Sequence, residues 1–476
     1  MIGKHLIGGT WVEGPEMRDN INPSNIADVV GRFAEGGTNE IEAAVAAAHM
    51  AAPTWAESTP QQRFDILDFI GGEILQNKQE LGLLLAREEG KTLPEAIGEV
   101  GRAGQIFKFF AGEALRQRGD RIASVRPGVD VQVTREPLGV VGLITPWNFP
   151  IAIPAWKIAP ALAFGNSVVL KPAELTPASA FALAEIIDRS DLPTGVFNLV
   201  MGPGSEAGKA LVENPRVAAV SFTGSVTTGR GIATACAARM AKFQLEMGGK
   251  NPLVVLDDAD LDVAVEAALN GAFYSTGQRC TASSRLIVTE GIYDRFTQAL
   301  TQRVSGLVVG DATQRGTQIG PVIDSRQLAK NLSYLEIGKE EGARLLCGGA
   351  RLELKKEGYY MRPALFGETE NNMRINREEI FGPIASLIRA TDYEQALELA
   401  NDTEFGLCAG ICTSSLKKAE HFKRYSQSGM VMVNLPTAGV DYHVPFGGRG
   451  ASSYGSREQG TYAAEFYTTV KTTYSY

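Results

Sequence analysis

The sequence predicts an α/β protein with two parallel sheets and a small β arm. Its 476 residues exceed what one hydrophobic core usually supports, so two or three domains are expected. From Pro137 onward, continuous apolar runs alternate with helical patterns, which is typical of parallel strands covered by helices on both faces. The last residues, FYTTVKTTYSY, alternate apolar and polar side chains and predict a terminal strand.

The first quarter of the chain predicts helices followed by a hairpin. The apolar spacing favours helices at 40–52 and 60–75, and a third helical stretch runs from Lys78 to about Phe110. Thr92-Leu93-Pro94 interrupts that stretch and divides it into two helices. The segment Arg121–Val133 is rich in Arg, Val and Pro, and it predicts a strand hairpin that leaves the main body.

The middle of the chain predicts a first parallel sheet. Strands and helices alternate in the order GVVGLITP, helix 155–163, SVVLKP, helix 177–188, VFNLVMG, helix 205–213 and AAVSFTGS. A sheet of this kind binds ligands outside the carboxyl ends of its strands.

A second α/β set follows Gly248-Gly249-Lys250 and predicts the second sheet. Its order is PLVVLD, helix 261–274, SRLIVTE, helix 293–307, IASLIRAT and helix 393–401. The terminal strand, 466–474, has no neighbouring segment with which to pair locally, and an unpaired edge invites another chain. We therefore expect it to pair with another subunit.

Composition excludes several classes of function. The net charge is −8 and no long basic run occurs, which argues against nucleic acid or an anionic membrane surface as partner. The amino terminus lacks the apolar core of a signal peptide, and no apolar run approaches membrane-spanning length. Five scattered cysteines favour free thiols in a reducing cytoplasm, and with four histidines no metal site is expected.

Two glycine clusters follow predicted strands. Gly202-Pro203-Gly204-Ser205, with Gly208 beyond it, favours a tight strand-to-helix turn, because Pro203 removes an amide that a phosphate could use. Gly224-Ser225 opens a helix, where free amides and a hydroxyl suit a pyrophosphate. Lys171 and Glu174, after the neighbouring strand, could hydrogen-bond ribose hydroxyls or belong to an ordinary surface loop.

Cys280 lies among small polar residues in YSTGQRCTASSR. Buried structural cysteines usually have apolar neighbours, so this position favours an exposed, reactive thiol on a polar loop, although a chance placement explains it equally well from the residues alone.

Seven motifs, in order along the chain, resemble those of the aldehyde dehydrogenase superfamily. They are PWNFP at 146–150, KPAE at 171–174, FTGS at 222–225, LEMGGKNP at 245–252, GQRC at 277–280, EEIFGP at 378–383 and PFGG at 445–448. The resemblance covers essentially the whole chain. It implies a Rossmann-like cofactor domain (1–118 and 138–248), a catalytic domain (249–452), an oligomerisation arm (119–137 and 453–476), and a homodimer or homotetramer.

The resemblance also assigns catalytic roles. Cys280 matches the nucleophile that adds to the aldehyde, and Glu246 matches the general base. Asn148 matches the oxyanion donor, together with the backbone N–H of Cys280. Lys157 and Glu458 match a proton-relay pair, although ordinary surface charge explains each almost as well.

The implied cofactor is NAD, with NADP possible. Lys171 and Glu174 match the residues at the adenosine ribose, and Glu174 should repel a 2′-phosphate. Ser225 matches the residue at the pyrophosphate, and Glu379 with Phe381 match those at the nicotinamide half. Trp147, Gly224 and Gly248 are further expected cofactor-binding residues.

The substrate is the least readable feature. The segment 436–448, PTAGVDYHVPFGG, resembles the α-ketoglutaric semialdehyde branch of the superfamily, so a dicarboxylic semialdehyde is expected. Its distal carboxylate needs a cation or amide donors; Arg279, Arg285 and His443 are candidates, with a structural role favoured for Arg285. The alternatives are succinic or glutaric semialdehyde, a broad aldehyde range, a coenzyme A-acylating enzyme, a cysteine–histidine thiol hydrolase and a non-enzymatic structural role.

Overall fold

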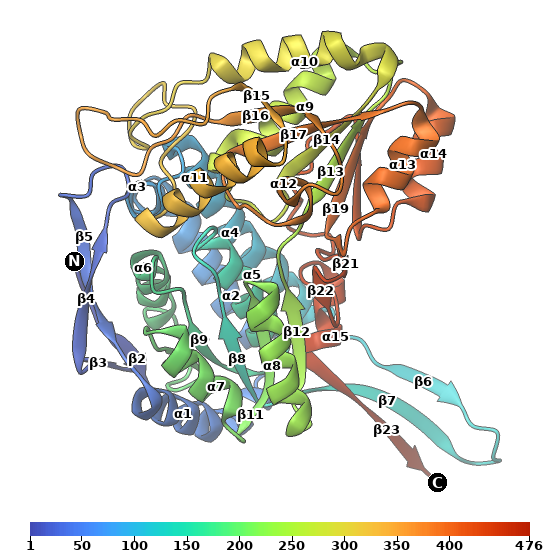
Figure 1. Ribbon diagram of the computed structural model, residues 1–476. Helices are drawn as coiled ribbons and strands as arrows, with labels where there is room; N and C mark the ends of the chain where they lie inside the picture. Colours follow the sequence, from blue (N-terminus) through green and yellow to red (C-terminus); the bar gives the residue numbers. More distant parts are fainter.

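The computed structural model describes residues 1–476 and contains two large sheets, each covered by helices on both faces (Figure 1). This confirms the α/β class. The five strands β12, β11, β8, β9 and β10 of the first sheet are parallel, and antiparallel strands close both edges. The order is β22 (Ser453–Tyr454), β12 (Lys242–Glu246), β11 (Val217–Thr223), β8 (Val140–Ile144), β9 (Ser167–Lys171), β10 (Phe197–Leu199), β2 (His5–Ile7) and β3 (Thr10–Val12).

Both faces of this sheet are buried, which explains why its strands are continuously apolar. Neighbouring residues of β9 point to opposite cores: Val168 and Leu170 pack in one, and Val169 in the other. The first core lies under α5 (Ala152–Ala163), α6 (Pro177–Asp188), α2 (Pro60–Gln76), α3 (Lys78–Glu89) and α4 (Leu93–Leu115). The second lies under α1 (Thr38–Ala56), α7 (Lys209–Glu213) and α8 (Val226–Ala238).

The second sheet repeats this arrangement above the first in Figure 1. Helices α9 (Leu261–Phe273) and α10 (Glu290–Ser305) cover one face, and α13 (Tyr393–Asn401) and α14 (Leu416–Tyr425) cover the other. Its strands are, in order, β15 (Arg344–Cys347), β16 (Ala364–Thr369), β17 (Ile384–Ala390), β14 (Ser283–Thr289), β13 (Asn251–Val255), β19 (Cys408–Cys412) and β20 (Met430–Val433). Near β16 lie α11 (Ser325–Glu340) and α12 (Arg374–Arg377).

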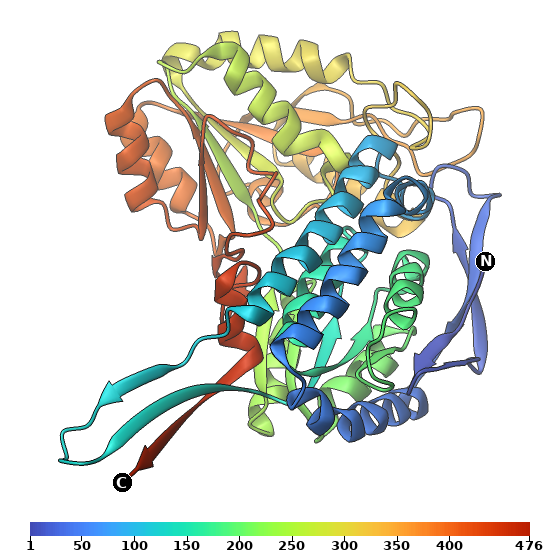
Figure 2. The same cartoon turned by 180° about the vertical axis from the view of Figure 1, so that it is seen from behind.

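A three-stranded antiparallel sheet projects from the body as an arm (Figures 1 and 2). It consists of β6 (Asp120–Ala123), β7 (Asp130–Pro137) and β23 (Thr468–Ser475). The expectation that the terminal strand lacks a local partner was wrong, because β23 pairs with β7 along its whole length. The other edge of β23 has no partner strand within the chain. Ser453–Tyr454 belongs to the first sheet, so the second segment of the arm sheet begins only at Thr468.

Several elements escaped the sequence analysis. The amino terminus forms a small sheet of β1 (Ile2–Gly3), β5 (Val29–Glu35) and β4 (Glu16–Ile21), and α11, α12 and α14 were not predicted. The expected helix 205–213 starts with a π-helical turn, Gly204–Gly208. Short elements complete the chain: η2 (Tyr274–Gly277), β18 (Phe405–Gly406), β21 (Arg449–Gly450), η3 (Thr461–Ala463) and α15 (Ala464–Tyr467).

The expected break between two helices at Thr92 is confirmed. Gly90 ends α3 with φ +93°, where a side chain would be strained. Thr92 then caps α4, and Glu95 closes the capping box with bonds from the Thr92 N–H and hydroxyl.

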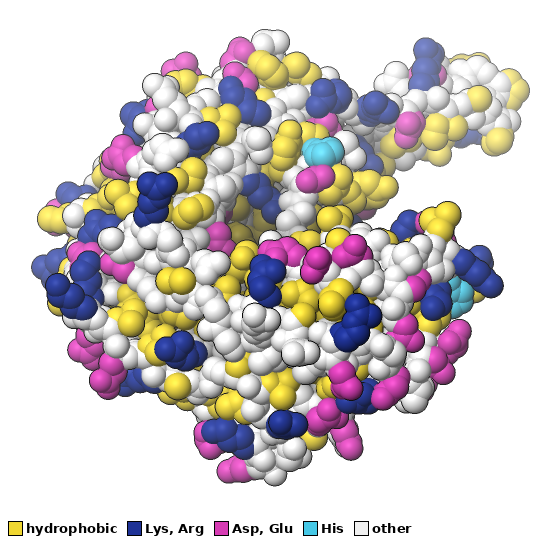
Figure 3. All heavy atoms as spheres, turned by 90° about the horizontal axis from the view of Figure 1, so that it is seen from above, with side chains coloured by type: hydrophobic (Ala, Val, Ile, Leu, Met, Phe, Trp, Pro, Cys, Tyr) yellow, Lys and Arg dark blue, Asp and Glu magenta, His cyan; other side chains and the backbone are white.

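Two further observations concern the apolar character of the helices and the distribution of charge on the surface. No helix combines the length and apolar character needed to cross a bilayer. On the face shown in Figure 3, basic and acidic side chains are interspersed around a hollow.

Candidate active site and cofactor cleft

A cleft of about 870 Å³ lies at the carboxyl ends of the first sheet's strands. Its walls come from the segments after β8 and β9, the end of β11, the first turns of α8, and the turn that opens α7. Among the residues expected to bind cofactor, it is lined by Trp147, Lys171, Glu174, Gly224 and Ser225.

Lys171 and Glu174 lie together on one wall of this cleft. The Lys171 side chain is almost fully buried, and its Nζ lies 4.0 Å from Glu174 Oε2. Glu174 Oε2 also accepts a hydrogen bond from the N–H of Gly204 at 3.2 Å. Burial lowers the pKa of Lys171, and Glu174 partly offsets that effect. The pair therefore offers a donor and an acceptor at one point, as the hydroxyls of a ribose require.

Gly224 and Ser225 form the amino-terminal entrance of α8. Ser225 caps the helix, because its Oγ accepts from the N–H of Thr228 at 3.3 Å. A Cβ on Gly224 would lie 2.5 Å from the Phe222 ring, so only glycine fits. The first turn of α8 thus presents free amides to the cleft, which is a site suited to an anion.

The Gly204–Gly208 turn is part of the cleft, which the sequence analysis did not expect. Gly204, Ser205 and Gly208 line it opposite α8. A Cβ on Gly204 would meet nothing closer than Lys171 Nζ at 3.9 Å, so the glycines leave room for a ligand. Pro203 has no N–H and so interrupts the backbone amides of this turn, but the turn still forms part of the cleft wall.

Glu379, Phe381 and Gly248 do not line this cleft, but they adjoin it through Trp147, which contacts Phe381. Glu379 Oε1 accepts from the N–H of Gly249 at 3.0 Å, and a Cβ on Gly248 would lie 2.3 Å from Glu379 Oε2. Phe381 has φ +62° and packs edge-on against Trp147, with 5.3 Å between ring centroids. Burial raises the pKa of Glu379.

The loop of Cys280 is mostly buried, contrary to the expectation of an exposed polar loop. Ser275, Thr276 and Gly277 all have positive φ, at +51°, +57° and +63°. Left-handed backbone at two non-glycine residues is strained and persists only when its surroundings hold it. The hydrogen bonds of the polar side chains hold the strained backbone of this loop in place. Cys280 itself is partly exposed.

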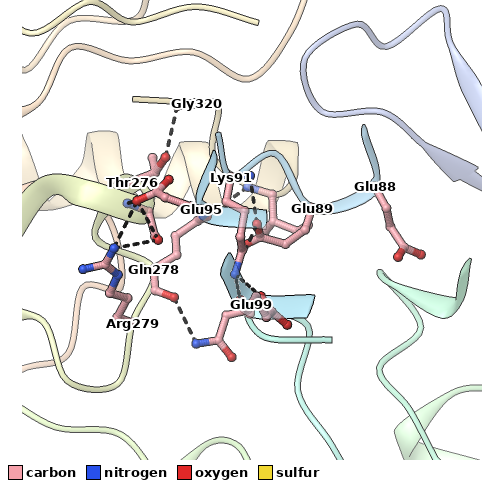
Figure 4. Close-up of polar contacts among 12 residues, drawn as sticks. Glu88, Glu89, Lys91, Glu95, Glu99, Thr276, Gln278, Arg279 and Gly320 are labelled. Atoms are coloured by element: carbon pink, nitrogen blue, oxygen red, sulfur yellow. Dashed lines mark hydrogen bonds and ion pairs between the residues drawn. The ribbon is translucent and has the colours of Figure 1, made fainter. Parts of the chain in front are cut away.

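Glu95 provides much of this support (Figure 4). Its Oε1 accepts from the N–H of Ser275 at 2.8 Å, from the Ser275 hydroxyl at 3.1 Å, and from Arg279 Nη2 at 3.1 Å. The hydroxyl of Thr276 donates to Gly320 O at 3.1 Å. The start of α4 therefore holds the nucleophile loop from one side.

Asn148 lies against the same loop. Its Nδ2 donates to Gln278 O at 3.0 Å. The Asn148 carbonyl accepts from the buried Lys91 Nζ at 2.6 Å, and Lys91 Nζ also donates to Glu99 Oε2 at 2.6 Å. Lys91, Glu95 and Glu99 thus hold both loops from one helix end. Glu95 and Glu99 are four residues apart and therefore lie on one face of α4, whereas Lys91 lies just before that helix. The spacing of the two glutamates is a sequence signal that could have indicated their shared role.

Glu246 ends β12 and is buried. Its Oε2 accepts from the Ser453 hydroxyl at 2.6 Å. Burial, and then the charge of Glu458, raises its pKa well above the usual value for a carboxyl. A carboxylate with a raised pKa is a stronger proton acceptor near neutral pH.

The Cys280 thiol needs such an acceptor. Burial, followed by the charges of Glu246 and Glu379, raises its pKa to about 12. These contributions also indicate that both carboxyls lie near the sulfur. A thiol with this pKa is protonated at neutral pH, so its proton must be removed before it can act as a nucleophile.

Lys157 and Glu458 form a buried ion pair rather than surface charges. Lys157 Nζ also donates to Ser221 Oγ at 2.7 Å, and the Ser221 hydroxyl contacts Glu458 Oε1 at 3.2 Å. The charge of Glu458 raises the pKa of Glu246. The Lys157–Glu458 pair therefore lies close enough to Glu246, the expected general base, to act on it electrostatically.

The substrate candidates fare differently. Arg285 is fully buried and bonded to Lys250 O, Asn371 Oδ1, Leu399 O and Ala400 O, so it is not a substrate residue and has the structural role that the sequence favoured. Arg279 lies beside the nucleophile, but its guanidinium is occupied by Glu95, Ser275 and Asn270. His443 is exposed and packs on Tyr442, with 5.4 Å between ring centroids. No group of three or more His, Cys, Asp or Glu side chains is arranged to hold a metal ion.

A cleft of dinucleotide size beside a partly exposed cysteine thiol, with a buried carboxyl and an amide near that thiol, is the arrangement of a cofactor-dependent oxidoreductase. Comparison with known proteins identifies the family of oxidoreductases. The model of the aldehyde dehydrogenase family matches residues 11–473, and the chain belongs to this family, whose members are NAD(P)-dependent oxidoreductases.

Three relatives illustrate the similarity. The α-ketoglutaric semialdehyde dehydrogenase of Bacillus subtilis is 45% identical over 474 residues, covering 99% of this chain and 97% of its own. The 2,5-dioxopentanoate dehydrogenase of Saccharolobus solfataricus is 41% identical, covering 98% and 97%. Betaine aldehyde dehydrogenase from Staphylococcus aureus, solved in complex with NAD⁺, has a TM-score of 0.97 and 35% identity and covers 99% and 94%.

Proposed function

We propose that the chain oxidises a short aldehyde bearing a distal carboxylate, in the class of α-ketoglutaric semialdehyde, to the corresponding dicarboxylic acid. The observation that carries this proposal is the convergence of Cys280, Asn148 and Glu246 beside the cofactor cleft. Asn148 directly follows Trp147 of the cleft wall, and Glu246 is paired across the sheet with Thr223 of that wall. The names of the two semialdehyde relatives support the substrate class.

The roles of the side chains follow from their positions. Glu246 takes the thiol proton, and the Cys280 sulfur adds to the aldehyde carbon. The Asn148 amide and the Cys280 N–H then stabilise the negative oxygen of the thiohemiacetal. NAD(P)⁺ bound in the cleft would supply the hydride acceptor, which leaves a thioester on Cys280. Glu246 then releases the thiol proton to solvent and takes a proton from a water, whose oxygen attacks the thioester carbon, and Cys280 leaves as the thiolate with the bonding electrons.

The residues of the cleft fit a dinucleotide. Lys171 and Glu174 suit the ribose hydroxyls, and the α8 amino terminus suits the pyrophosphate. We propose NAD as the preferred form, because the Glu174 carboxylate would repel a 2′-phosphate. Glu246 favours hydrolysis over transfer of the acyl group to coenzyme A, since it can activate water.

Assembly and location are part of the same proposal. The free edge of β23 and the exposed arm favour a homodimer or homotetramer built through this sheet. Five free cysteines fit the reducing cytoplasm.

Replacing the nucleophile tests the function. Cys280→Ala should abolish NADH production from every aldehyde, while NAD⁺ affinity stays within about twofold of the wild type, because the cleft does not depend on the thiol. Steady-state absorbance at the nicotinamide band and a binding titration measure the two effects. Dehydrogenase turnover near the wild-type rate would refute the mechanism.

Removing β23 tests the assembly. Deleting residues 468–476 spares the buried Phe466 and Tyr467, so the body should fold while sedimentation shows a monomer or aggregate. A truncated protein that sediments like the wild type would show that the arm does not hold the oligomer.

A further inference from the structure

Arg102, on α4, carries a charge that no carboxylate neutralises directly. It donates one hydrogen bond, from Nη2 to Gln459 Oε1 at 3.0 Å, and its Nε lies buried without a partner. Arg279 and Arg285 differ, because their guanidinium groups are bonded to protein acceptors on several sides.

Two more donors without partners lie beside this guanidinium. They are Nε1 of Trp156 and Nε2 of Gln459, and these side chains belong to residues that are only 5% and 0% exposed. The Arg102 Cζ lies 5.6 Å from the centroid of the Trp156 ring, and Gln459 is bonded to Arg102 directly. Because buried polar groups almost always have partners, these three donors without a protein partner mark a place where an acceptor from a ligand or from solvent would bind.

The group lies close to the nucleophile. The Trp156 and Phe446 rings are 5.3 Å apart between centroids, and Cys280 packs against the cluster that contains Phe446. Burial lowers the pKa of Arg102, and the charges that oppose this include Glu99, Asp441 and Cys280. The thiol and Trp156 therefore both adjoin the cluster that contains Phe446.

The backbone at Gln459 is also unusual. Its φ of +60° is left-handed, which glutamine rarely adopts. Glu458 immediately precedes it and is held by Lys157. With this backbone conformation the Gln459 amide contacts Arg102, while Glu458 stays paired with Lys157. Strained backbone of this kind concentrates at functional sites.

We propose that Arg102, Trp156 and Gln459 form the subsite for the distal carboxylate of the substrate. The acceptor missing from the site is an anion with two oxygens, which the guanidinium and indole N–H groups bind while the Gln459 amide donates to the second oxygen or to an adjacent keto oxygen. The aldehyde carbon at the other end of a short ω-oxo acid then reaches Cys280 across Phe446. This subsite rests on the proposed function, since it assumes that Cys280 is the reacting thiol.

The test compares two aldehydes of equal length, one with the carboxylate and one without it. Glutaric semialdehyde and pentanal are assayed with NAD⁺ in the wild type, Arg102→Met, Arg102→Lys and the control Lys108→Met. Lys108 is on the same helix but pairs with Asp68 on α2. Inhibition of pentanal oxidation by glutarate, which cannot react, reports binding at the subsite alone.

Arg102→Met should lower kcat/KM for glutaric semialdehyde by about 100-fold and weaken glutarate inhibition similarly, because a charged hydrogen-bond partner is lost. Pentanal oxidation should stay within about threefold. Arg102→Lys should lose less than Arg102→Met, and Lys108→Met should match the wild type.

Equal losses on both aldehydes, in Arg102→Met or in Arg102→Lys, would assign Arg102 a structural role and overturn the subsite. So would a wild type that does not prefer the carboxylate-bearing aldehyde. A wild type that oxidises neither aldehyde would instead count against the proposed function.

Discussion

The cofactor cleft and the surroundings of Cys280 are assembled from different distances along the chain. The cleft uses short segments that directly follow β8, β9 and β11, and each segment contributes its own backbone and side chains. The thiol environment instead joins Glu95, Asn148, Glu246 and Phe446 from both large sheets and the helices between them. Local motifs therefore indicate cofactor residues, whereas the residues around the nucleophile are defined by their distant partners.

Arginine shows this difference most clearly. Arg279 and Arg285 are near Cys280 in sequence and were chosen for that reason, yet their charges are satisfied by the protein. Arg102 is distant in sequence and has unpaired donors. Closeness to Cys280 along the chain predicted which arginines lie in the same region of the fold. It did not predict which guanidinium group is available to bind a ligand.

The largest expected effect concerns Glu246. Glu246→Gln removes the base for both the thiol and the water, so steady-state turnover should fall by about 1,000-fold. A first-turnover burst of NADH should remain but form more slowly, because the thiol can still lose its proton to solvent while the thioester accumulates. Stopped-flow absorbance separates the two phases. Unchanged steady-state turnover would exclude the deacylation role.

The pH dependence sharpens the same assignment. The raised pKa of Glu246 means that it loses its proton at a higher pH than an ordinary carboxyl. As pH falls through that pKa the base becomes protonated, so kcat should decline on the acidic side starting nearer neutrality than for an unperturbed glutamate. A kcat profile that stays flat down to pH 5 would contradict this role.

An intermediate effect is expected at Glu95, which contacts neither substrate nor cofactor. Glu95→Gln weakens the support of the strained Ser275–Gly277 loop, so kcat should fall by about 10- to 100-fold with little change in KM for NAD⁺. Glu95→Asp should fall less if charge is what matters. Asp68→Asn, which breaks an ion pair between α2 and α4, is the matched control.

A uniform rise in KM for both substrates would contradict the positioning role of Glu95. So would equal loss in Asp68→Asn, because that result would reflect a general weakening of α4.

The smallest effect is expected in the cleft itself. Glu174→Ser removes the carboxylate beside the ribose, so kcat/KM with NADP⁺ should rise by about tenfold while that with NAD⁺ falls a few-fold. The ratio of the two constants is the measurement. An unchanged ratio would show that Glu174 does not set cofactor preference.

The sequence by itself determined the α/β class, the order of most strands and helices, and the strand-to-helix turns of the cleft. These are local properties: strands buried on both faces must be continuously apolar, and a turn such as Gly224-Ser225 needs a small residue and a cap within a few positions. The break at Thr92 was readable for the same reason.

Only the tertiary structure decided which polar residues are already satisfied. The local partner of β23, the buried Lys157–Glu458 pair, the support that Glu95 provides to a strained loop, and the unpaired donors around Arg102 all depend on contacts between segments far apart in the chain. A charge in a sequence has no partner until the chain folds, because burial and pairing are set by three-dimensional neighbours.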